Sequence, residues 1–181
     1  RQRQMCIRDR YTRVLKQPSS PSNTGYAPAN NSRQMKTYDQ LIAETATQIS
    51  ELMPWDLAEK MDTGESMLLV DVREADEYRV MRISDSVNIP RGILESASEP
   101  GYDETHPQLG VARNQQVIVI CRSGKRSCLA AHTLQLLGFN HVFSLKTGLR
   151  GWNDYDQLLV DEDNQPVDGD QAEEFLRPKV G

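Results

Sequence analysis

A cysteine followed by a cationic, glycine-containing loop is the feature of this sequence with the clearest chemical meaning. The stretch ICRSGKRSC, residues 120–128, places Cys121 directly after an apolar run, with three cations close behind it. Cysteine reacts as its thiolate, and positive charge or a helix N-terminus beside the sulfur favours that form. Gly124 lets the backbone turn so that successive N–H groups face one anion. We therefore expect Cys121 to be a nucleophile within an anion-binding loop.

The residues after Cys121 combine backbone donors with cationic side chains. A helix predicted to begin here leaves its first N–H groups free to bind an anion. The cations add positive charge that steers anionic substrates to the loop, and Ser127 is a candidate cap for the helix. The predicted substrate-binding residues are Arg122, Ser123, Gly124, Lys125, Arg126 and Ser127.

Strands and helices are predicted to alternate around this loop. Apolar runs predict strands at 67–72, 86–90, 116–120 and 141–145. Helical patterns cover 38–52, 54–64, 73–81, 127–139 and 147–155. This order predicts an α/β fold in which helices flank a central parallel sheet on both faces. Ligands bind such sheets beyond the carboxyl ends of the strands, which is where Cys121 lies.

Length and composition limit the class of protein. The chain has 181 residues, 38% of them hydrophobic, which suits one domain with extensions. It contains no apolar run long enough to span a bilayer, so no membrane partner is expected. The three cysteines, Cys6, Cys121 and Cys128, are too few for a disulfide framework. We therefore expect a reducing, cytoplasmic location.

The two ends of the chain differ from the middle. Residues 1–34 hold seven of the 21 Lys and Arg but one of the 26 Asp and Glu, which leaves 35–181 with a net charge of −11. We expect 1–34 to be a disordered tail or a non-native segment, with Met35 as a candidate start. The acidic body argues against a nucleic-acid partner. Residues 159–181 are expected to form a loose acidic tail.

Four motifs follow one another along the chain: LLVDVREADEY, SVNIPRG, CRSGKRS and FSLKTGLRGW. In this order they resemble the rhodanese family of sulfurtransferases, and the resemblance covers about residues 48–157. It implies a rhodanese-like fold, which we assign to a domain at 35–158 with an N-terminal helix at about 38–52. Two segments depart from the family pattern: MRISD at 81–85, and the pair Thr147-Gly148 where the family usually has two glycines. We expect the departure at MRISD to change local geometry more than activity.

The resemblance also implies a mechanism and its partners. Cys121 would take sulfane sulfur from a small anionic donor such as thiosulfate and pass it to cyanide or a thiol, without cofactor or metal. Backbone N–H groups of residues 122–126 would hold the persulfide. Asp71 and Arg73 match a charged pair of the family, and we expect them to be buried and to tie the first predicted strand to the loop. Arg91 is expected to face the same pocket.

Other functions are compatible with the same residues. The domain could be a persulfide carrier or a non-catalytic binding module that acts with a protein donor or acceptor of sulfur. A phosphatase of related fold needs Cys, five residues and then Arg, but Arg126 comes one residue early. Cys128 could resolve an oxidised Cys121, although its helical position favours a small buried residue.

Overall fold

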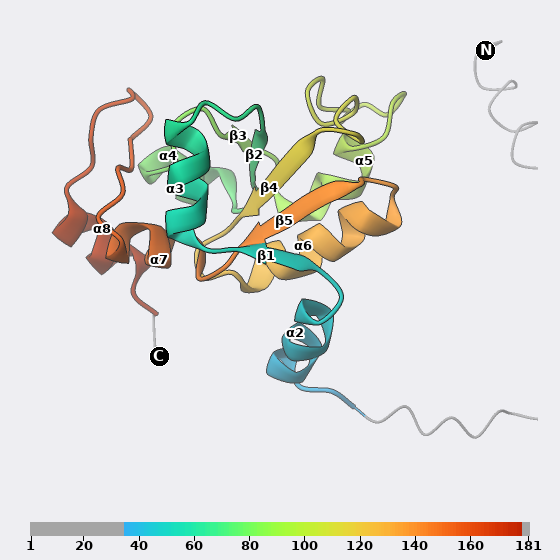
Figure 1. Ribbon diagram of the computed structural model, residues 1–181, viewed down its shortest axis with the longest axis horizontal. Coiled ribbons are helices and arrows are strands. Elements are labelled where there is room, and N and C mark those ends of the chain that lie inside the picture. Colours follow the sequence, from blue (N-terminus) through green and yellow to red (C-terminus); the bar gives the residue numbers. More distant parts are fainter. Residues whose placement is uncertain (1–34, 179–181) are drawn as a thin grey trace, which may run out of the picture. The chain divides into compact units, whose positions relative to one another are not determined.

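A five-stranded parallel sheet forms the centre of the protein. The computed structural model describes residues 35–178; the predicted tail at 1–34, with Cys6, lies outside the described residues, as do residues 179–181. The strand order is β1-β5-β4-β2-β3, and all neighbours are parallel (Figure 1). The strands are β1 (Ser50–Leu52), β2 (Leu68–Asp71), β3 (Val87–Asn88), β4 (Gln116–Ile120) and β5 (His141–Leu145).

Helices connect the strands and cover the sheet. They are α2 (Tyr38–Ala46), α3 (Pro54–Asp62), α4 (Ala75–Val80), α5 (Leu94–Ala97), α6 (Lys125–Leu136), α7 (Gly148–Asp154) and α8 (Gly169–Leu176), with a 3₁₀ turn η1 at Arg91–Ile93. Within residues 35–178, none of these helices is long and apolar enough to cross a membrane.

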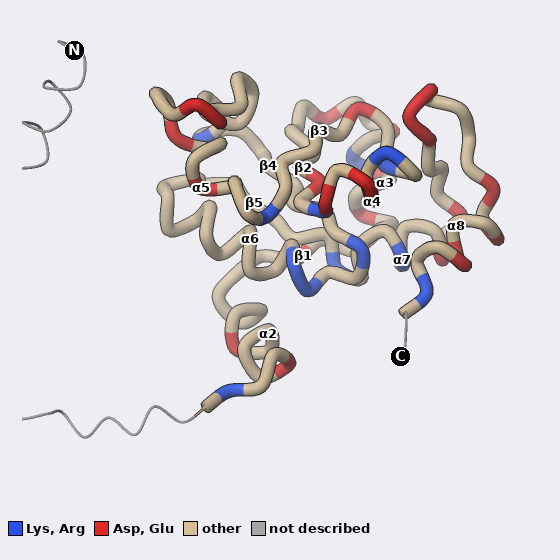
Figure 2. The backbone as a smooth tube through the Cα atoms, turned by 180° about the vertical axis from the view of Figure 1, so that it is seen from behind, with Lys and Arg blue, Asp and Glu red and all other residues tan. Residues whose placement is uncertain are grey.

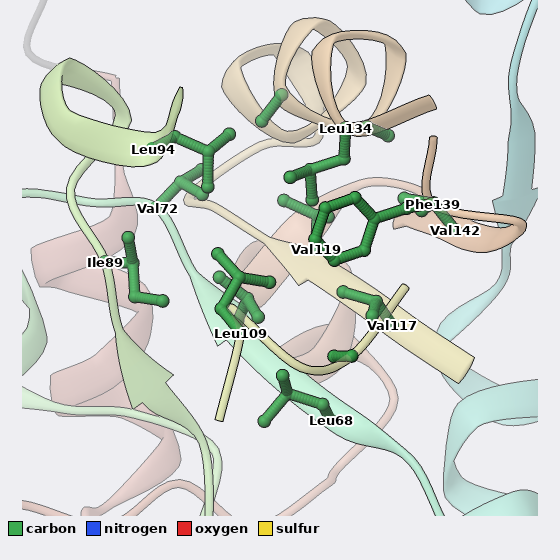
Figure 3. Close-up of a cluster of buried hydrophobic side chains, with 14 of the residues drawn as sticks. Leu68, Val72, Ile89, Leu94, Leu109, Val117, Val119, Leu134, Phe139 and Val142 are labelled. Carbon is green, nitrogen blue, oxygen red and sulfur yellow. The ribbon is translucent and has the colours of Figure 1, made fainter. Parts of the chain in front are cut away.

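Alternation along the strands produces two separate hydrophobic layers. Val70 and Val119 belong to a cluster with residues of α5 and α6, whereas Leu69 and Ile118 belong to a cluster with residues of α3, α7 and α8. Figure 3 shows the first cluster, in which leucines and valines of β2, β4 and the helix layer meet. Successive strand residues point to opposite faces, so a sheet buried on both sides needs continuous apolar runs. The predicted α/β fold with helices on both faces is confirmed.

The prediction of one helix over 38–52 is wrong in its second half. The helix α2 ends at Ala46, and Ser50–Leu52 forms the edge strand β1. This strand pairs with β5, and the Leu52 carbonyl accepts a hydrogen bond from the Lys146 N–H at 2.9 Å. Apolar spacing over so short a stretch fits a helix and a strand equally. Pairing with β5, far away in the sequence, selects the strand.

The segment expected to be a loose acidic tail is folded against the domain as far as α8. Leu159 and Val160 are buried, and the Val160 backbone exchanges two hydrogen bonds with that of Arg82, at 2.8 and 2.9 Å. Ala172 and Leu176 of α8 are buried against the α3 and α7 side of the sheet. The apolar residues that dock this segment are few and widely spaced. The acidic composition of the segment therefore predicted a loose tail.

The departing segment MRISD takes part in this docking. Met81 and Ile83 are buried in the same layer as Leu159, and the residue between them, Arg82, makes the backbone bridge to Val160. Asp85 has a φ of 60°, the left-handed conformation that Asp tolerates better than most residues. The altered turn is therefore accommodated by local backbone geometry and by a buried contact with the C-terminal segment.

Replacing Leu159 by Ala tests whether the C-terminal segment is part of the fold. Leu159 is 1% exposed, and its neighbour Leu158 is 59% exposed. We expect Leu159→Ala to lower the free energy of unfolding by about 2–5 kcal/mol. The matched control Leu158→Ala should stay within about 0.5 kcal/mol of the wild type. Urea denaturation of both variants checks this, and equal stabilities would show that the segment contributes nothing.

Candidate active site

Cys121 lies at the carboxyl end of β4, in the place expected from the sequence. Its side chain is 1% exposed and belongs to the α6 side of the sheet. The Ser127 N–H donates to the Cys121 Sγ at 3.3 Å, and the Ser127 Oγ lies 3.5 Å from the same sulfur. A buried thiol that accepts a hydrogen bond from a backbone N–H in the first turn of a helix is placed to carry negative charge.

Ser127 supports the thiol and does not cap the helix. The N-cap residue of α6 is Gly124, so the predicted capping role of Ser127 is wrong. The Ser127 hydroxyl is buried, donates to the Gly124 carbonyl at 3.0 Å and accepts from the Ser144 hydroxyl at 2.8 Å. These bonds hold Ser127 in the first turn of α6, next to the sulfur.

The carbonyl groups of the loop point toward α7. The Leu149 N–H donates to the Cys121 carbonyl at 2.9 Å, and the Arg150 N–H donates to the Arg122 carbonyl at 3.1 Å. In a planar trans peptide the N–H points opposite to the carbonyl. The N–H groups of Arg122 and Ser123 therefore face away from α7. Within residues 35–178, none of the N–H groups of residues 122–126 donates to a protein acceptor, so five successive donors remain for a ligand.

Two glycines allow this close approach of the loop and α7. A Cβ added to Gly148 would lie 2.2 Å from the Cys121 carbonyl oxygen, and one added to Gly124 would lie 3.0 Å from the Thr147 nitrogen. Both glycines have positive φ, 60° and 85°. Thr147, which stands where the family usually has a glycine, also has a φ of 65°. The departing pair therefore keeps the left-handed turn, although a β-branched residue adopts it only under strain.

A polar cleft of about 520 Å³ opens beside the loop. It is lined by four cations, one carboxylate and a few uncharged residues: Arg122, Lys125, Arg126, Arg150, Glu77, Ser123, Tyr38, Leu176 and Pro178. Figure 2 shows Lys and Arg gathered on the loop between the labels of α6 and α7, with Asp and Glu concentrated on other segments. The loop is thus a local positive region on an acidic domain, which attracts anions to the thiol.

Two of the four cations are paired and two are not. Arg126 makes two hydrogen bonds of 2.7 Å to the Glu77 carboxylate, and Lys125 pairs with Asp39 at 2.5 Å. In the part of the chain that the structure describes, Arg122 and Arg150 form no ion pair. Their charges are therefore available to a bound anion.

The Glu77–Arg126 pair changes the pKa of both partners. Burial by itself would raise the pKa of Glu77, but the hydrogen bonds and charge of Arg126 outweigh it and hold that pKa below 4.5. The hydrogen bonds that Arg126 donates to Glu77 raise the pKa of Arg126 more than burial lowers it, and the charges of Glu77 and Cys121 add to the effect. The pair is thus ionised at neutral pH and keeps the Arg126 guanidinium at the edge of the cleft.

Asp71 and Arg73 form the predicted buried pair, but they reach the loop by an indirect route. Both side chains are fully buried, with the Arg73 Nη2 2.7 Å from the Asp71 Oδ2. Arg73 also donates to the carbonyls of Glu77, at 3.1 Å, and Met81, at 2.6 Å. These bonds anchor α4 and its C-terminal end to β2. Support for the loop then passes from α4 through the Glu77 carboxylate to Arg126.

Arg91 and Cys128 lie apart from the cleft. Arg91 pairs with Glu95 at 2.8 Å and donates to the Thr133 hydroxyl at 3.1 Å, so the expectation that it faces the pocket is wrong. Arg91 begins the 3₁₀ turn η1, which directs its side chain toward Thr133 of α6. Cys128 is buried 3.8 Å from the Ile42 carbonyl of α2. Burial, then the charges of Glu51 and Cys121, raise the pKa of the Cys128 thiol.

The cleft contains residues that sequence reasoning missed. Tyr38, Glu77 and Arg150 line it, although they lie far from Cys121 in the sequence. Arg150 stands within the closing motif FSLKTGLRGW, so its place just after Gly148 was a usable signal. Tyr38 had no such signal, because the packing of α2 against α6 brings it to the site.

Comparison with known proteins gives the family. A family model described as the Rhodanese-like domain matches residues 53–155. The chain belongs to the rhodanese-like domain family. Its matched segment contains the loop after β4, the buried Asp71–Arg73 pair and the closing helix α7.

Two relatives of this rhodanese-like domain have names that refer to sulfur chemistry. It is 33% identical over 110 residues to the putative sulfur carrier protein YrkF of Bacillus subtilis, with 61% of this chain and 54% of the relative covered. It is 31% identical over 103 residues to a putative mitochondrial thiosulfate sulfurtransferase of Schizosaccharomyces pombe, covering 55% of this chain and 72% of the relative. The chain thus spans about half the length of the Bacillus relative. Sulfur transfer is the general chemistry that these relatives support.

A solved structure supports the fold alone. A protein of unknown function from Rhodopseudomonas palustris, described as a possible tyrosine phosphatase, superposes with a TM-score of 0.63 at 24% identity. The match covers 77% of this chain and 98% of the other. At this identity the similarity concerns the arrangement of strands and helices, and it carries no chemistry across to the rhodanese-like domain.

Gly148→Ala tests the contact between the loop and α7. The added Cβ would overlap the Cys121 carbonyl oxygen, and alanine is strained at a positive φ. We expect the free energy of unfolding to fall by about 1–3 kcal/mol. Gly92→Ala is the matched control, because its Cβ meets no atom within 4 Å. Thermal denaturation measures both, and equal melting temperatures would show that the contact is not tight.

The Glu77–Arg126 pair predicts a pH dependence of stability. The folded-state pKa of Glu77 lies below its unfolded value, so the ionised pair stabilises the fold above the unfolded value. This contribution disappears as the pH falls through the folded pKa. We therefore expect Glu77→Gln to be less stable than the wild type at neutral pH, with the difference narrowing below about pH 4.5.

Urea denaturation over a pH series measures this difference. Asp76→Asn on the same helix is the control, because its pair with Arg79 is exposed and exposed pairs contribute little. A Glu77→Gln difference that stays constant down to acidic pH would show that the carboxylate charge is not the cause.

Proposed function

We propose that this domain is a sulfurtransferase in which Cys121 carries sulfane sulfur as a persulfide. The observation that supports this most directly is the arrangement at the end of β4. A buried thiol lies beside five successive backbone N–H groups that have no acceptor in the described part of the chain. Such donors stabilise an anion, at about 1.5–3 kcal/mol for each hydrogen bond to a charged group. The terminal sulfur of a persulfide is an anion of suitable size.

In the first step the Cys121 thiolate attacks the outer sulfur of an anionic donor such as thiosulfate. A bond forms between the Cys121 Sγ and that sulfur, while the sulfur–sulfur bond of the donor breaks. Sulfite leaves with the electron pair of the broken bond. The cationic cleft attracts the dianionic donor, and the N–H groups of residues 122–126 take over the charge of the terminal sulfur.

In the second step an acceptor removes the outer sulfur. The carbon of cyanide, or the sulfur of a thiolate, attacks the terminal sulfur of the persulfide. The bond to the Cys121 Sγ breaks, and its electron pair regenerates the thiolate. The two steps balance without an external oxidant or reductant, and neither needs a cofactor. The location expected from cysteine usage, the cytoplasm, stays a prediction.

A persulfide carrier supplied by a protein donor is the second candidate. The named Bacillus relative is a putative sulfur carrier, and the chain covers 54% of it. In a carrier the persulfide would form from a partner protein, and thiosulfate would react slowly or not at all.

Intact mass after brief exposure to thiosulfate tests the sulfurtransferase. We expect the wild type and Cys128→Ser to gain one sulfur atom and to lose it on addition of cyanide. Cys121→Ser should gain none, because the nucleophile is absent. Cys128 is the matched control, since it is a second buried cysteine a few residues away. A wild type that stays unmodified by thiosulfate but accepts sulfur from a protein persulfide would favour the carrier.

A further inference from the structure

The strand β5 carries a hydroxyl side chain on the face that it buries against α6. Val142 belongs to the α6 layer (Figure 3) and Phe143 packs against the opposite layer. Because strand residues alternate between faces, Ser144 again faces α6. Its side chain is fully buried, at 0% exposure. Taking a hydroxyl out of water is unfavourable unless it finds a hydrogen-bond partner, so a small apolar residue would suit packing alone better.

The Ser127 hydroxyl is the one partner of the Ser144 side chain within residues 35–178. The Ser144 Oγ donates to the Ser127 Oγ at 2.8 Å, and the Ser127 Oγ lies 3.5 Å from the Cys121 Sγ. Ser127 is also fully buried. A chain of contacts therefore runs from β5, through the first turn of α6, to the nucleophile.

The Ser127 hydroxyl has one hydrogen to donate and two lone pairs that accept. In the structure it donates to the Gly124 carbonyl at 3.0 Å. Its oxygen accepts from the Ser144 hydroxyl and from the Cys121 thiol. A thiolate has no hydrogen to donate, so the same arrangement would turn a lone pair of Ser127 toward a negative sulfur. Ionisation of Cys121 therefore favours rotation of the Ser127 hydrogen from the Gly124 carbonyl to the sulfur.

The surrounding hydrogen bonds permit this rotation. The Gly124 carbonyl also accepts the Cys128 N–H at 3.0 Å, so it keeps a partner when the Ser127 hydrogen leaves. The Ser144 hydroxyl can donate to the Ser127 oxygen in both states, and it holds that oxygen in place. A hydroxyl that accepts one hydrogen bond is also a stronger donor to a third group, because the bonds polarise one another.

We propose that Ser144 is a positioning residue for the chemistry of Cys121. Its hydroxyl fixes the Ser127 oxygen and directs the Ser127 hydrogen to the sulfur whenever that sulfur is an anion. Cys121 is an anion before it takes up sulfur, and again when an acceptor removes the outer sulfur of the persulfide. Ser144 acts on the sulfur through Ser127. The inference rests on the proposed sulfurtransferase function, but it concerns the ionisation of Cys121, which is measurable without a sulfur donor.

The pH profile of alkylation tests the proposal. Iodoacetamide reacts with the thiolate and not with the thiol. Mass spectrometry of the Cys121 peptide from the full chain gives the rate for this cysteine separately from the others. We expect Ser144→Ala to move the midpoint of the profile upward by about 0.5–1 pH unit, the shift that one hydrogen bond to the anion accounts for. The rate at the high-pH plateau should stay at the wild-type value, because the thiolate itself is unchanged.

Neighbouring groups change their charge outside the range of this profile. Burial raises the pKa of Tyr38 above 10.0 and the pKa of Cys128 above 9.0. Burial opposes ionisation of Glu77, but the hydrogen bond with Arg126 holds the pKa of Glu77 below 4.5. Between about pH 5 and 9 the profile therefore reports Cys121. The other charged side chains on the neighbouring elements are Arg122, Lys125, Arg150 and the ion pair of Asp71 with Arg73.

A matched pair of variants separates the hydroxyl from packing. Ser144→Thr keeps the hydroxyl, whereas Ser144→Val has a methyl group in its place, and both add similar bulk to the buried position. We expect Ser144→Thr to keep the wild-type midpoint and Ser144→Val to shift it as Ser144→Ala does. Ser98→Ala is the control, because Ser98 is also fully buried but its hydroxyl donates to the Glu95 carbonyl of α5 at 2.8 Å. It should leave the profile unchanged.

Failure of the inference differs from failure of the proposed function. Below the midpoint, loading of Ser144→Ala with thiosulfate should be about three- to ten-fold slower than loading of the wild type, in proportion to the thiolate fraction. A wild type that is alkylated at Cys121 but gains no sulfur contradicts the proposed function alone. Ser144→Ala with a lower melting temperature but the wild-type midpoint contradicts the inference alone, because its role is then structural. So do equal midpoints for Ser144→Thr and Ser144→Val.

Discussion

The contact between the loop after β4 and the start of α7 is the constraint on which the candidate site depends. The carbonyls of Cys121 and Arg122 are bound by N–H groups of α7, and Gly148 leaves no room for a side chain between them. Because each peptide unit is planar, fixing its carbonyl also fixes the N–H on its other side. The orientation of the anion-binding donors is therefore set before any ligand arrives. A preorganised site of this kind needs no rearrangement when charge develops on the sulfur.

The charged groups connect the core to the cleft in a definite order. Asp71 and Arg73 are buried, and Arg73 binds the carbonyl of Glu77 within the short helix α4 and that of Met81 directly after it. That helix presents Glu77, which in turn holds Arg126 at the edge of the cleft. Breaking the buried pair would leave a charge without a partner, which is far more costly than losing a surface pair. The pair thus affects the site through the position of α4, without contact between Arg73 and the thiol.

Elements at the two ends of the described chain add to the family's common core. The helix α2 packs against α6, and α8 packs against the opposite layer with α7. Both contribute side chains to the cleft although neither belongs to the matched segment. The core thus supplies the nucleophile and the anion-binding backbone, while the added helices shape the space around them. Such a division allows the size of the ligand to change while the chemistry stays the same.

The sequence by itself determined the features that depend on neighbouring residues. Strands β4 and β5 were predicted to the residue, because buried parallel strands need continuous apolar runs, and the loop at Cys121 follows from its own motif. Only the tertiary structure decided that Ser50–Leu52 is a strand, that α8 docks, and that Arg91 turns away from the cleft. Each of these depends on a partner distant in the sequence, such as β5 or α6. Local periodicity records whether a residue is buried, but it does not record which partner buries it.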